Sequence, residues 1–336
     1  MKGRAMRIAI VGAGAVGCLF AARLAACHQV TLIARRSLVV RAIRDQGIEL
    51  TSPQGQVTRH AVAVTDDPLS VGPQDAVVLC VKAYALPGVL GTVSQLTGPR
   101  TAIVPVLNGV PWWFLYGRPK LAGGERLAAL DVDGGLAAAI PFAQVIGGVT
   151  YVAVERTGIG RIHHVRGGDC MFGEPGAGGG ARSRAGRLSA AEIALAFRAG
   201  GLEGDAVEDI RAHVWTKLLG NAAFNPLSVL TGATQEAICA DLPVCALARR
   251  MMMETQAVGE RLGIAPVMSI EARIEAAAAI GAFRTSMLQD HLAGQQLELA
   301  AMLGAVIELA ERLAVEVPTL RMVHALADLR GRSHGD

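Results

Sequence analysis

The sequence predicts an α/β domain at the N-terminus, built on a parallel sheet, followed by an all-helical C-terminal domain. The first 110 residues alternate short β-branched runs with helical patterns, which is typical of a parallel α/β sheet. Beyond Ile210 the strand-like runs stop, and the chain becomes rich in Ala, Leu and Glu with helical periodicity. Because 336 residues exceed one ordinary domain, we expect two, at residues 1–208 and 209–336.

The first domain is expected to hold a series of buried strands. Residues 75–81, which read DAVVLCV, are nearly all apolar, as in a strand that helices cover on both faces. The glycine-rich stretch at 176–180 predicts a surface loop. The expected helices are 15–26 and 190–199, and the expected strands are 7–11, 30–34, 75–81, 101–107, 147–155, 161–165 and 206–208, with 147–155 and 161–165 at the far edge of the sheet.

The second domain is expected to consist of helices separated by prolines. Helical periodicity is clearest at 246–262 and 295–313, and Pro243, Pro266 and Pro318 fall between expected helices. The run Met251-Met252-Met253 is a candidate surface for a homodimer.

The composition excludes several classes of protein. A net charge of +3 with scattered basic residues does not give the basic patch of a nucleic-acid-binding protein. No stretch of about 18 apolar residues predicts a membrane span, and no signal-type run opens the chain, so we expect a cytoplasmic protein. The six cysteines lack C-x-x-C spacing, and His163-His164 fall in an expected strand, so no metal site is predicted.

A glycine motif follows the first expected strand and opens the first expected helix. In G-x-G-x-x-G, Gly12 permits the tight turn, Gly14 lets a pyrophosphate approach the backbone, and Gly17 allows close contact of helix and strand. The N–H groups at the start of a helix favour the negative charge. We therefore predict a Rossmann-type dinucleotide site formed by Gly12, Gly14, Ala15, Val16 and Gly17.

The end of the second expected strand distinguishes NADPH from NADH. NAD-binding folds place Asp or Glu there, whereas this chain reads Arg35-Arg36 and has no acid before Asp45. A guanidinium suits a 2′-phosphate by charge and by its two parallel donors. We predict NADPH/NADP+ as cofactor, with Arg35 bound to the 2′-phosphate. Arg36 is the alternative contact, and a solvated surface arginine without a ligand is the structural alternative.

Two polar residues stand at the carboxyl ends of later strands, where ligands bind in such folds. Lys82 follows the third strand and could reach a phosphate or a carboxylate. Asn108, in Asn108-Gly109, follows the fourth and could contact the nicotinamide ribose. A surface lysine and a turn asparagine are the structural alternatives.

A polar stripe crosses an otherwise apolar helical segment. Lys217, Asn221 and Asn225 are four residues apart, so they drift only about 40° per step around a helix. An unpaired lysine on a buried face would be costly, and a cleft in front of the stripe resolves this. A purely structural hydrogen-bond network is the alternative.

The pattern Lys-x-x-x-Asn-x-x-x-Asn-Pro-Leu, with the glycine motif, Lys82 and Asn108-Gly109, resembles the 2-dehydropantoate 2-reductase (ketopantoate reductase) family. The resemblance spans nearly the whole chain and continues in Ser286-Met287-Leu288-Gln289-Asp290 and in Glu298. It implies NADPH-dependent reduction of 2-dehydropantoate to (R)-pantoate, on the route to pantothenate and coenzyme A.

The resemblance also implies a role for each matched residue. Lys217 would be the general acid that protonates the ketone oxygen. Asn221 and Asn225 would hold the substrate hydroxyl, Ser286 would bind the carboxylate, and Glu298 would accept from a substrate hydroxyl or contact the cofactor. The matched cofactor-side residues are Arg35, Lys82 and Asn108.

Helix geometry tests this assignment. On one straight helix Ser286 and Glu298 would be about 18 Å apart, too far for both to touch one small keto acid. We therefore expect the helix to break at Ala293-Gly294.

The chain departs from the family pattern after the glutamate. Many members continue with Ile-Asp and place an Asn before the glycine, whereas this chain reads Glu298-Leu299-Ala300-Ala301-Met302-Leu303-Gly304. Trp112-Trp113 is a further difference that could reshape the cleft. The alternatives are therefore a reductase of another 2-oxo acid, a dehydrogenase that oxidises a hydroxy acid, and a non-catalytic NADP-binding regulator.

Overall fold

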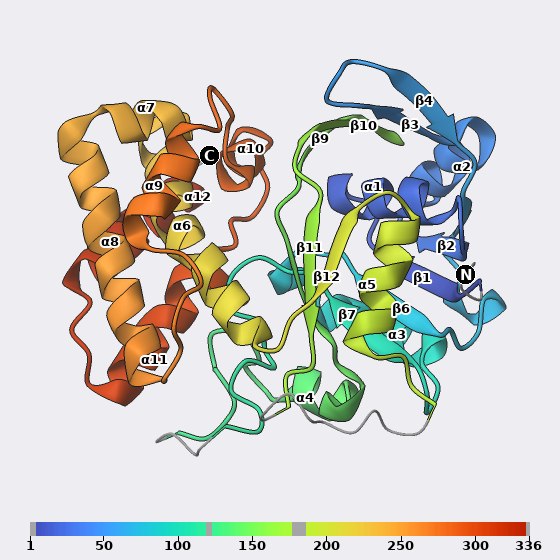
Figure 1. The fold of residues 1–336 in the computed structure, drawn as a ribbon, viewed down its shortest axis with the longest axis horizontal. Helices are drawn as coiled ribbons and strands as arrows, with labels where there is room; N and C mark the ends of the chain where they lie inside the picture. The colour runs from blue at the N-terminus through green and yellow to red at the C-terminus, as the bar shows by residue number, and fades with distance from the viewer. Residues whose placement is uncertain (1–4, 119–122, 177–185, 334–336) are drawn as a thin grey trace. The chain divides into compact units, whose positions relative to one another are not determined.

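The chain folds into two compact units in the computed structural model, which describes residues 5–118, 123–176 and 186–333. The first unit comprises Met1–Leu107 and Gly135–Ile210, and the second comprises Asn108–Gly134 and Arg211–Asp336 (Figure 1). None of the described helices is long and apolar enough to cross a bilayer.

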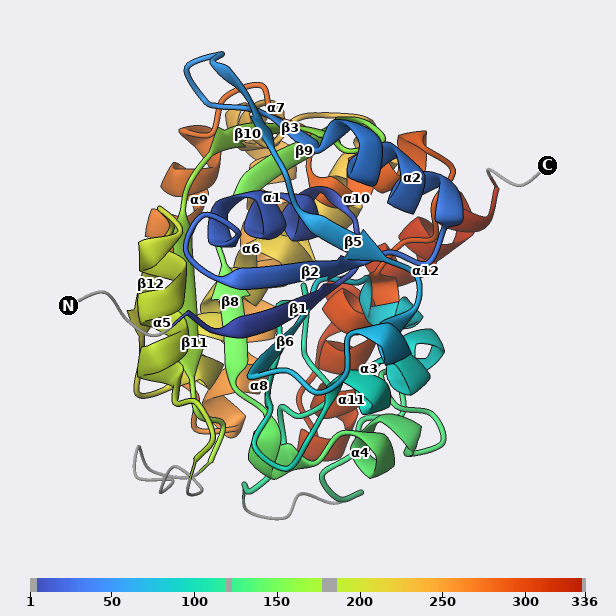
Figure 2. The same ribbon diagram turned by 90° about the vertical axis from the view of Figure 1, so that its right-hand side faces the viewer.

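The centre of the first unit is a parallel five-stranded sheet with the order β5-β2-β1-β6-β7 (Figure 2). The chain moves outward from β1 to β2 and β5, then returns to β6 on the other side of β1, so the strand order reverses between β1 and β6. Such a switch point opens a crevice at the carboxyl ends of the strands. The strands are β1 (Arg7–Val11), β2 (Gln29–Ile33), β5 (Ala63–Thr65), β6 (Ala76–Leu79) and β7 (Ala102–Pro105).

The four strands expected here from the sequence, at 7–11, 30–34, 75–81 and 101–107, are confirmed with small shifts of their ends. Every residue of β6 and β7 is buried, as their apolar sequences predict. The helices and 3-10 turns of this unit are α1 (Ala15–Leu24), α2 (Ser37–Gln46), α3 (Leu90–Leu96), α4 (Gly135–Ala139), α5 (Ala190–Ala199), η1 (Pro68–Ser70), η2 (Ala83–Ala85), η3 (Pro87–Val89) and η4 (Phe142–Gln144).

Two smaller sheets complete the first unit. One has the order β4-β3-β10-β9 and the other β12-β11-β8, and α1 packs between the central sheet and the strands β3, β9 and β10. Phe20 of α1 meets Phe197 of α5 edge to face, with ring centroids 5.0 Å apart. The strands are β3 (Ile48–Thr51), β4 (Val57–His60), β8 (Gly147–Thr150), β9 (Ala153–Gly158), β10 (Arg161–Arg166), β11 (Asp169–Gly173) and β12 (Glu203–Ala206).

The sequence prediction was partly wrong about one strand in this region. Residues 147–155 form two strands in different sheets, β8 and β9, with a break at Tyr151 and Val152. β8 lies next to the edge strand β7, through the isolated bridges Ile103↔Val145 and Val106↔Gly148, so the expected place at the far edge of the sheet is confirmed for this half. β10, in contrast, joins β3 and β9 instead of extending the central sheet. The strand expected at 206–208 lies at Glu203–Ala206, and residues 177–180 of the expected loop lie outside the described residues.

The described residues of the second unit form helices and no strand, which confirms the expected class. Pro318 begins a helix, where its missing N–H is unneeded, and Pro243 lies in the first turn of α8 instead of between helices. The helices are α6 (Ile210–Thr231), α7 (Gln235–Ala240), α8 (Leu242–Arg261), α9 (Ile270–Ala278), α10 (Ser286–Leu292), the π-helix η6 (Ala300–Gly304), α11 (Ala305–Leu313) and α12 (Pro318–Arg332).

Aromatic residues build the core of this unit. The ring of Phe114 stacks on that of Trp215 of α6 with centroids 5.4 Å apart, and the Trp215 indole N–H donates to the Thr255 carbonyl at 3.2 Å. Trp112 and Trp113 are 4 % and 1 % exposed, so they are core residues here. Met251 and Met252 are also fully buried, whereas Met253 is 57 % exposed, so only one residue of the methionine run reaches the surface.

The described residues of the segment 108–134 belong to the second unit and pack on helices that lie far along the chain. The Glu308 carboxylate of α11 accepts from the backbone N–H groups of Ala128 and Ala129, each at 2.9 Å. Arg312, which pairs with Glu308, donates to the carbonyls of Gly124 and Arg126. The expected first domain, residues 1–208, includes this segment, whereas its anchors belong to the second unit.

Candidate functional site

The three glycines after β1 have different surroundings, and each matches one requirement of a pyrophosphate-binding turn. Gly12 has φ +115, and a Cβ there would lie 2.6 Å from the Cys80 carbonyl oxygen at the end of β6. A Cβ on Gly17 would overlap the Gly12 carbonyl, so the third glycine allows α1 to approach β1.

Gly14 instead faces open space. It precedes the first residue of α1, and a Cβ there would have nothing within 4 Å. The first turn of α1 has no acidic residue, so the N–H groups of Ala15, Val16 and Gly17 stand at a helix end that favours an anion. The backbone therefore fits a pyrophosphate at this turn.

Arg35 lies beside the glycine turn. The Gly12 N–H donates to the Ile33 carbonyl of β2 at 3.0 Å, which joins the turn to the strand that Arg35 follows. Arg35 and Arg36 are exposed, and neither guanidinium forms an ion pair or hydrogen bond within the described part of the chain. Both remain available to a phosphate at this edge of the sheet.

Lys82 lies at the same edge as the glycine turn. β6 pairs with β1 from Ile8↔Ala76 to Val11↔Leu79, and Lys82 follows β6 to begin the turn η2. The switch point between β1 and β6 is therefore flanked by the glycine turn and by Lys82. The first unit thus brings together every expected cofactor residue except Asn108.

In the second unit the predicted polar stripe, Lys217, Asn221 and Asn225, lies on the long helix α6 (Figure 1). Lys217 and Asn221 are half-buried. Asn225 is 3 % exposed, and its Nδ2 donates to Met302 Sδ of η6 at 3.2 Å. The stripe is thus tied to the π-helix at its far end.

Ser286 is the first residue of α10, which is fixed to α6 by its neighbour. The hydroxyl of Thr285 accepts from the Leu288 N–H at 3.1 Å, and it shares a hydrogen bond of 2.6 Å with Ser228 of α6. The helix ends at Leu292, and Gly294 turns the chain with φ +63. The break expected at Ala293-Gly294 is confirmed.

Glu298 lies where the next helix begins. It is 4 % exposed, residues 295–298 are not helical, and its carbonyl accepts from the Met302 N–H at 3.2 Å. The helix expected at 295–313 therefore starts only after the glutamate.

The π-helix η6 also positions Asn108. The Val110 N–H donates to the Ala301 carbonyl at 2.8 Å, and a Cβ on Gly109 would lie 2.6 Å from the Ala301 carbonyl carbon. Glycine is required there by this approach and by its φ of +81. Asn108, Asn225 and Glu298 are thus all anchored to one short π-helix, an element often found at functional sites. Sequence periodicity alone does not reveal it.

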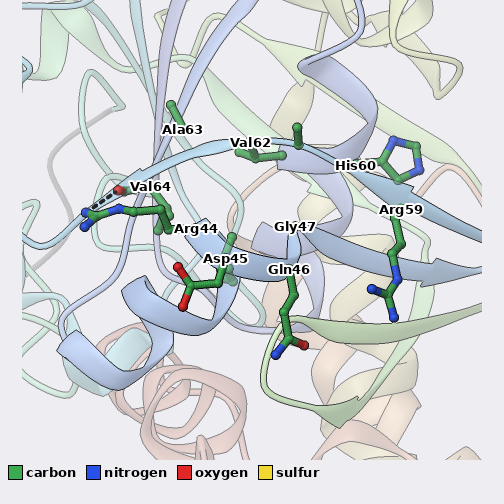
Figure 3. A pocket seen from close by; sticks show the side chains of 11 residues that line it. Arg44, Asp45, Gln46, Gly47, Arg59, His60, Val62, Ala63 and Val64 are labelled. Atoms are coloured by element: carbon green, nitrogen blue, oxygen red, sulfur yellow. Dashed lines mark hydrogen bonds between the residues drawn. The ribbon is translucent and has the colours of Figure 1, made fainter.

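A separate cavity of about 780 Å³ lies at the other end of the first unit's sheet (Figure 3). It is formed by the last turn of α2 and the chain that leads into β5. Because the central sheet is parallel, the cavity lies at the amino ends of its strands. Burial lowers the pKa of His60 on its wall, and Arg23 adds to this effect. The cavity contains none of the residues expected to bind cofactor or substrate.

The thiols of Cys18 and Cys80 in the first unit are hard to ionise. Burial raises the pKa of the Cys18 thiol to about 12 and raises that of Cys80 further. Across the described ranges, no group of three or more His, Cys, Asp or Glu side chains could hold a metal ion.

Two family models match the chain. The model described as "Ketopantoate reductase PanE/ApbA" matches residues 8–177, and its C-terminal counterpart matches residues 209–330. The chain belongs to the ketopantoate reductase family. Curated relatives of this ketopantoate reductase family member agree: the 2-dehydropantoate 2-reductase of Mesorhizobium japonicum is 40 % identical over 96 % of each chain. That of Halobacterium salinarum is 29 % identical over 96 % of this chain and 97 % of its own.

Solved structures give the same result. A protein from Ralstonia solanacearum MolK2 is 38 % identical, with a TM-score of 0.88 and coverage of 98 % of each chain. The 2-dehydropantoate 2-reductase of Methylococcus capsulatus is 28 % identical, with a TM-score of 0.79 and the same coverage. A D-mandelate dehydrogenase solved with NADH and anilino(oxo)acetate has a TM-score of 0.81 over 98 % of this chain and 99 % of its own; at 18 % identity it shares the fold alone.

Proposed function

We propose that this protein reduces 2-dehydropantoate to (R)-pantoate with NADPH, and that Lys217 is the general acid. The observation that carries the proposal is the polar stripe on α6, which presents one ammonium and two amides on an apolar helix. The relatives named 2-dehydropantoate 2-reductase support the substrate.

The cofactor residues belong to the first unit, apart from Asn108. The helix end at Gly14, Ala15 and Val16 would bind the pyrophosphate, and Arg35 the 2′-phosphate. Lys82 would bind a phosphate or ribose from the neighbouring strand end. When bound, the nicotinamide supplies the hydride that reduces the ketone carbon.

Lys217 would supply the proton that completes the reduction. As the ketone carbon gains hydride, its oxygen gains negative charge; the ammonium stabilises that charge and transfers a proton to form the alcohol. Asn225 donates to Met302 through Nδ2, so its Oδ1 is the atom we assign to a substrate hydroxyl. Ser286 and Glu298, on either side of the confirmed helix break, would contact the rest of the substrate.

A second substrate class is favoured by one observation. After Glu298 the π-helix Ala300–Gly304 reads AAMLG and presents no polar side chain, where many family members have two. This favours another 2-oxo acid with fewer polar groups at the end that η6 contacts. The expected homodimer and the functional division into residues 1–208 and 209–336 also stay predictions.

One assay tests the proposal. NADPH absorbance is followed with 2-dehydropantoate and a panel of branched 2-oxo acids, and we expect oxidation that is fastest with 2-dehydropantoate. A faster rate with another acid would change the substrate. Measurable NADPH binding without oxidation by any acid would instead support the non-catalytic regulator, and turnover only of hydroxy acids with NADP+ would support the dehydrogenase.

A further inference from the structure

Ser228 of α6 joins the two elements that carry Asn225 and Ser286. It follows Asn225 by three residues and is 0 % exposed. Its hydroxyl oxygen lies 2.7 Å from the Asn225 carbonyl oxygen and 2.6 Å from the hydroxyl oxygen of Thr285, the residue that precedes α10. One buried hydroxyl therefore contacts both α6 and the start of α10.

The chemistry of these groups determines the direction of each hydrogen bond. A hydroxyl has one proton to donate and a carbonyl can only accept, so Ser228 donates to the Asn225 carbonyl. Thr285 must then donate to Ser228, and its own oxygen accepts from the Leu288 N–H at 3.1 Å. A continuous hydrogen-bonded chain thus runs from the first turn of α10 to the backbone of Asn225. Removing one hydroxyl leaves a buried donor or acceptor unpaired.

α6 lacks one of its own hydrogen bonds beside Asn225. Pro226 follows inside the helix and has no N–H, so the helical bond to the Ala222 carbonyl is missing. The Asn225 side chain is held separately, since its Nδ2 donates to Met302 Sδ at 3.2 Å. Ser228 and Met302 therefore fix the backbone and the amide of this residue where the helix itself is weakest.

Two polar atoms next to this chain are available to a ligand. Asn225 Oδ1 has no hydrogen-bond partner among the described residues, and neither has the half-buried hydroxyl of Ser286. In the proposed reaction the first accepts from the substrate hydroxyl, and the family resemblance assigns the second to the carboxylate. 2-Dehydropantoate carries these groups at the two ends of a short carbon chain, so their protein partners must lie at a fixed separation.

We propose that Ser228 is a positioning residue, which sets the separation between Asn225 Oδ1 and the Ser286 hydroxyl. The enzyme thereby prefers a 2-oxo acid that carries a hydroxyl group at its far end. This inference rests on the proposed function. Asn225 ends the hydrogen-bonded chain and Ser286 adjoins Thr285, so any movement of α10 relative to α6 changes the separation directly. Small errors in such a separation weaken binding and reaction strongly.

The test compares Ser228→Ala with the control Thr255→Val on two acids, 2-dehydropantoate and 3-methyl-2-oxobutanoate, which lacks the hydroxymethyl group. Thr255 of α8 is also 0 % exposed, and its hydroxyl donates to the Met251 carbonyl at 2.9 Å. The control therefore loses a similar buried hydrogen bond on another helix.

We expect Ser228→Ala to raise KM for 2-dehydropantoate about tenfold, because the substrate no longer makes both contacts at once. KM for 3-methyl-2-oxobutanoate, or its inhibition constant if turnover is slow, should change less than about twofold, since this acid makes only the carboxylate contact. The Kd of NADPH should be unchanged, and Thr255→Val should leave both acids within about twofold.

The ratio of the two constants separates positioning from a structural role. A general weakening of the fold would affect both acids equally, and an unchanged ratio in Ser228→Ala overturns the inference while leaving the proposed function intact. If Ser228→Ala fails to fold, Thr285→Val removes the other hydroxyl of the link and should change the ratio by a similar factor. Thr285→Ser keeps that hydroxyl and should recover most of the preference; equal ratios in the two Thr285 variants also overturn the inference.

Failure of the proposed function has a different signature. The unaltered enzyme would then oxidise no NADPH with any 2-oxo acid. Calorimetric titration of 2-dehydropantoate into the NADPH complex then decides the role of Ser228: binding that is weakened about tenfold by Ser228→Ala and not by Thr255→Val supports it. Equal binding by the two variants, or no binding to the unaltered protein, overturns it.

Discussion

Two glycines of one turn are expected to respond differently to the same substitution. In Gly17→Ala the new methyl would overlap the Gly12 carbonyl and lie 3.3 Å from Cys80 Cβ, so the start of α1 must move away from β1. Backbone cannot swing aside as a side chain can, and we expect a loss of about 3 kcal/mol in the free energy of unfolding. That corresponds to a fall in Tm of about 6–12 °C, together with weaker NADPH binding.

Gly14→Ala is the matched change. Its methyl meets nothing within 4 Å, and φ at Gly14 is −80, which alanine adopts freely. The poorer helix cap, about 1 kcal/mol, is offset by a similar gain from the stiffer unfolded chain. Tm should therefore stay nearly constant while the Kd of NADPH rises at least tenfold, because the methyl occupies the space where the pyrophosphate approaches.

Thermal unfolding and fluorescence titration of NADPH measure both effects. Unchanged NADPH affinity in Gly14→Ala would refute a pyrophosphate at this helix end. An unchanged Tm in Gly17→Ala would refute the close packing of α1 on β1.

Three further changes test the rest of the site and the fold. Lys217→Ala should lower kcat by at least about a thousandfold at unchanged NADPH Kd, because the proton donor is lost. Arg35→Asp should lower the preference for NADPH over NADH about a hundredfold, whereas Arg36→Asp should change it less. Glu308→Ala should lower the free energy of unfolding by about 2 kcal/mol, since two N–H groups and an arginine lose a carboxylate partner. The control Glu311→Ala, which breaks an exposed ion pair, should lower it by under about 1 kcal/mol, as measured by thermal unfolding.

A specific result would contradict each of these three predictions. Activity that survives Lys217→Ala means that another group donates the proton. A larger effect at Arg36 than at Arg35 moves the phosphate contact by one residue. Equal Tm values for the Glu308 and Glu311 variants would mean that the carboxylate does not hold residues 128–129.

Local sequence patterns predicted the elements whose causes are local. The strand at 75–81 is apolar and every residue of β6 is buried, and Gly12, Gly14 and Gly17 follow from the geometry of one turn. The break after Ser286 was predicted because a straight helix would separate it too far from Glu298. In each case the residues that determine the feature lie within about 15 positions of one another in the sequence.

Features that depend on distant partners were missed. Residues 108–134 pack on Glu308 and Arg312, about 180 residues later, and nothing in the segment itself reveals those anchors. The π-helix η6 also has a distant partner, because the Val110 N–H donates to the Ala301 carbonyl. The contact of Arg273 with the backbone at Gly220 was also missed, although Gly220 stands in the middle of a long helical segment.

The placement of residues 108–134 has a consequence for how the protein is made. The chain passes between the two units three times, at residues 107–108, 134–135 and 210–211, so neither unit is a continuous stretch of sequence. During synthesis Phe114 and its neighbour Trp113 leave the ribosome about 100 residues before Trp215, on whose ring Phe114 stacks. At a rate of synthesis of about 5–20 residues per second, these aromatic side chains stay exposed for about 5–20 s before Trp215 has been synthesised. A growing chain of this length is therefore a natural client for a chaperone that shields aromatic segments, and a fragment that ends at residue 208 keeps that exposure permanently.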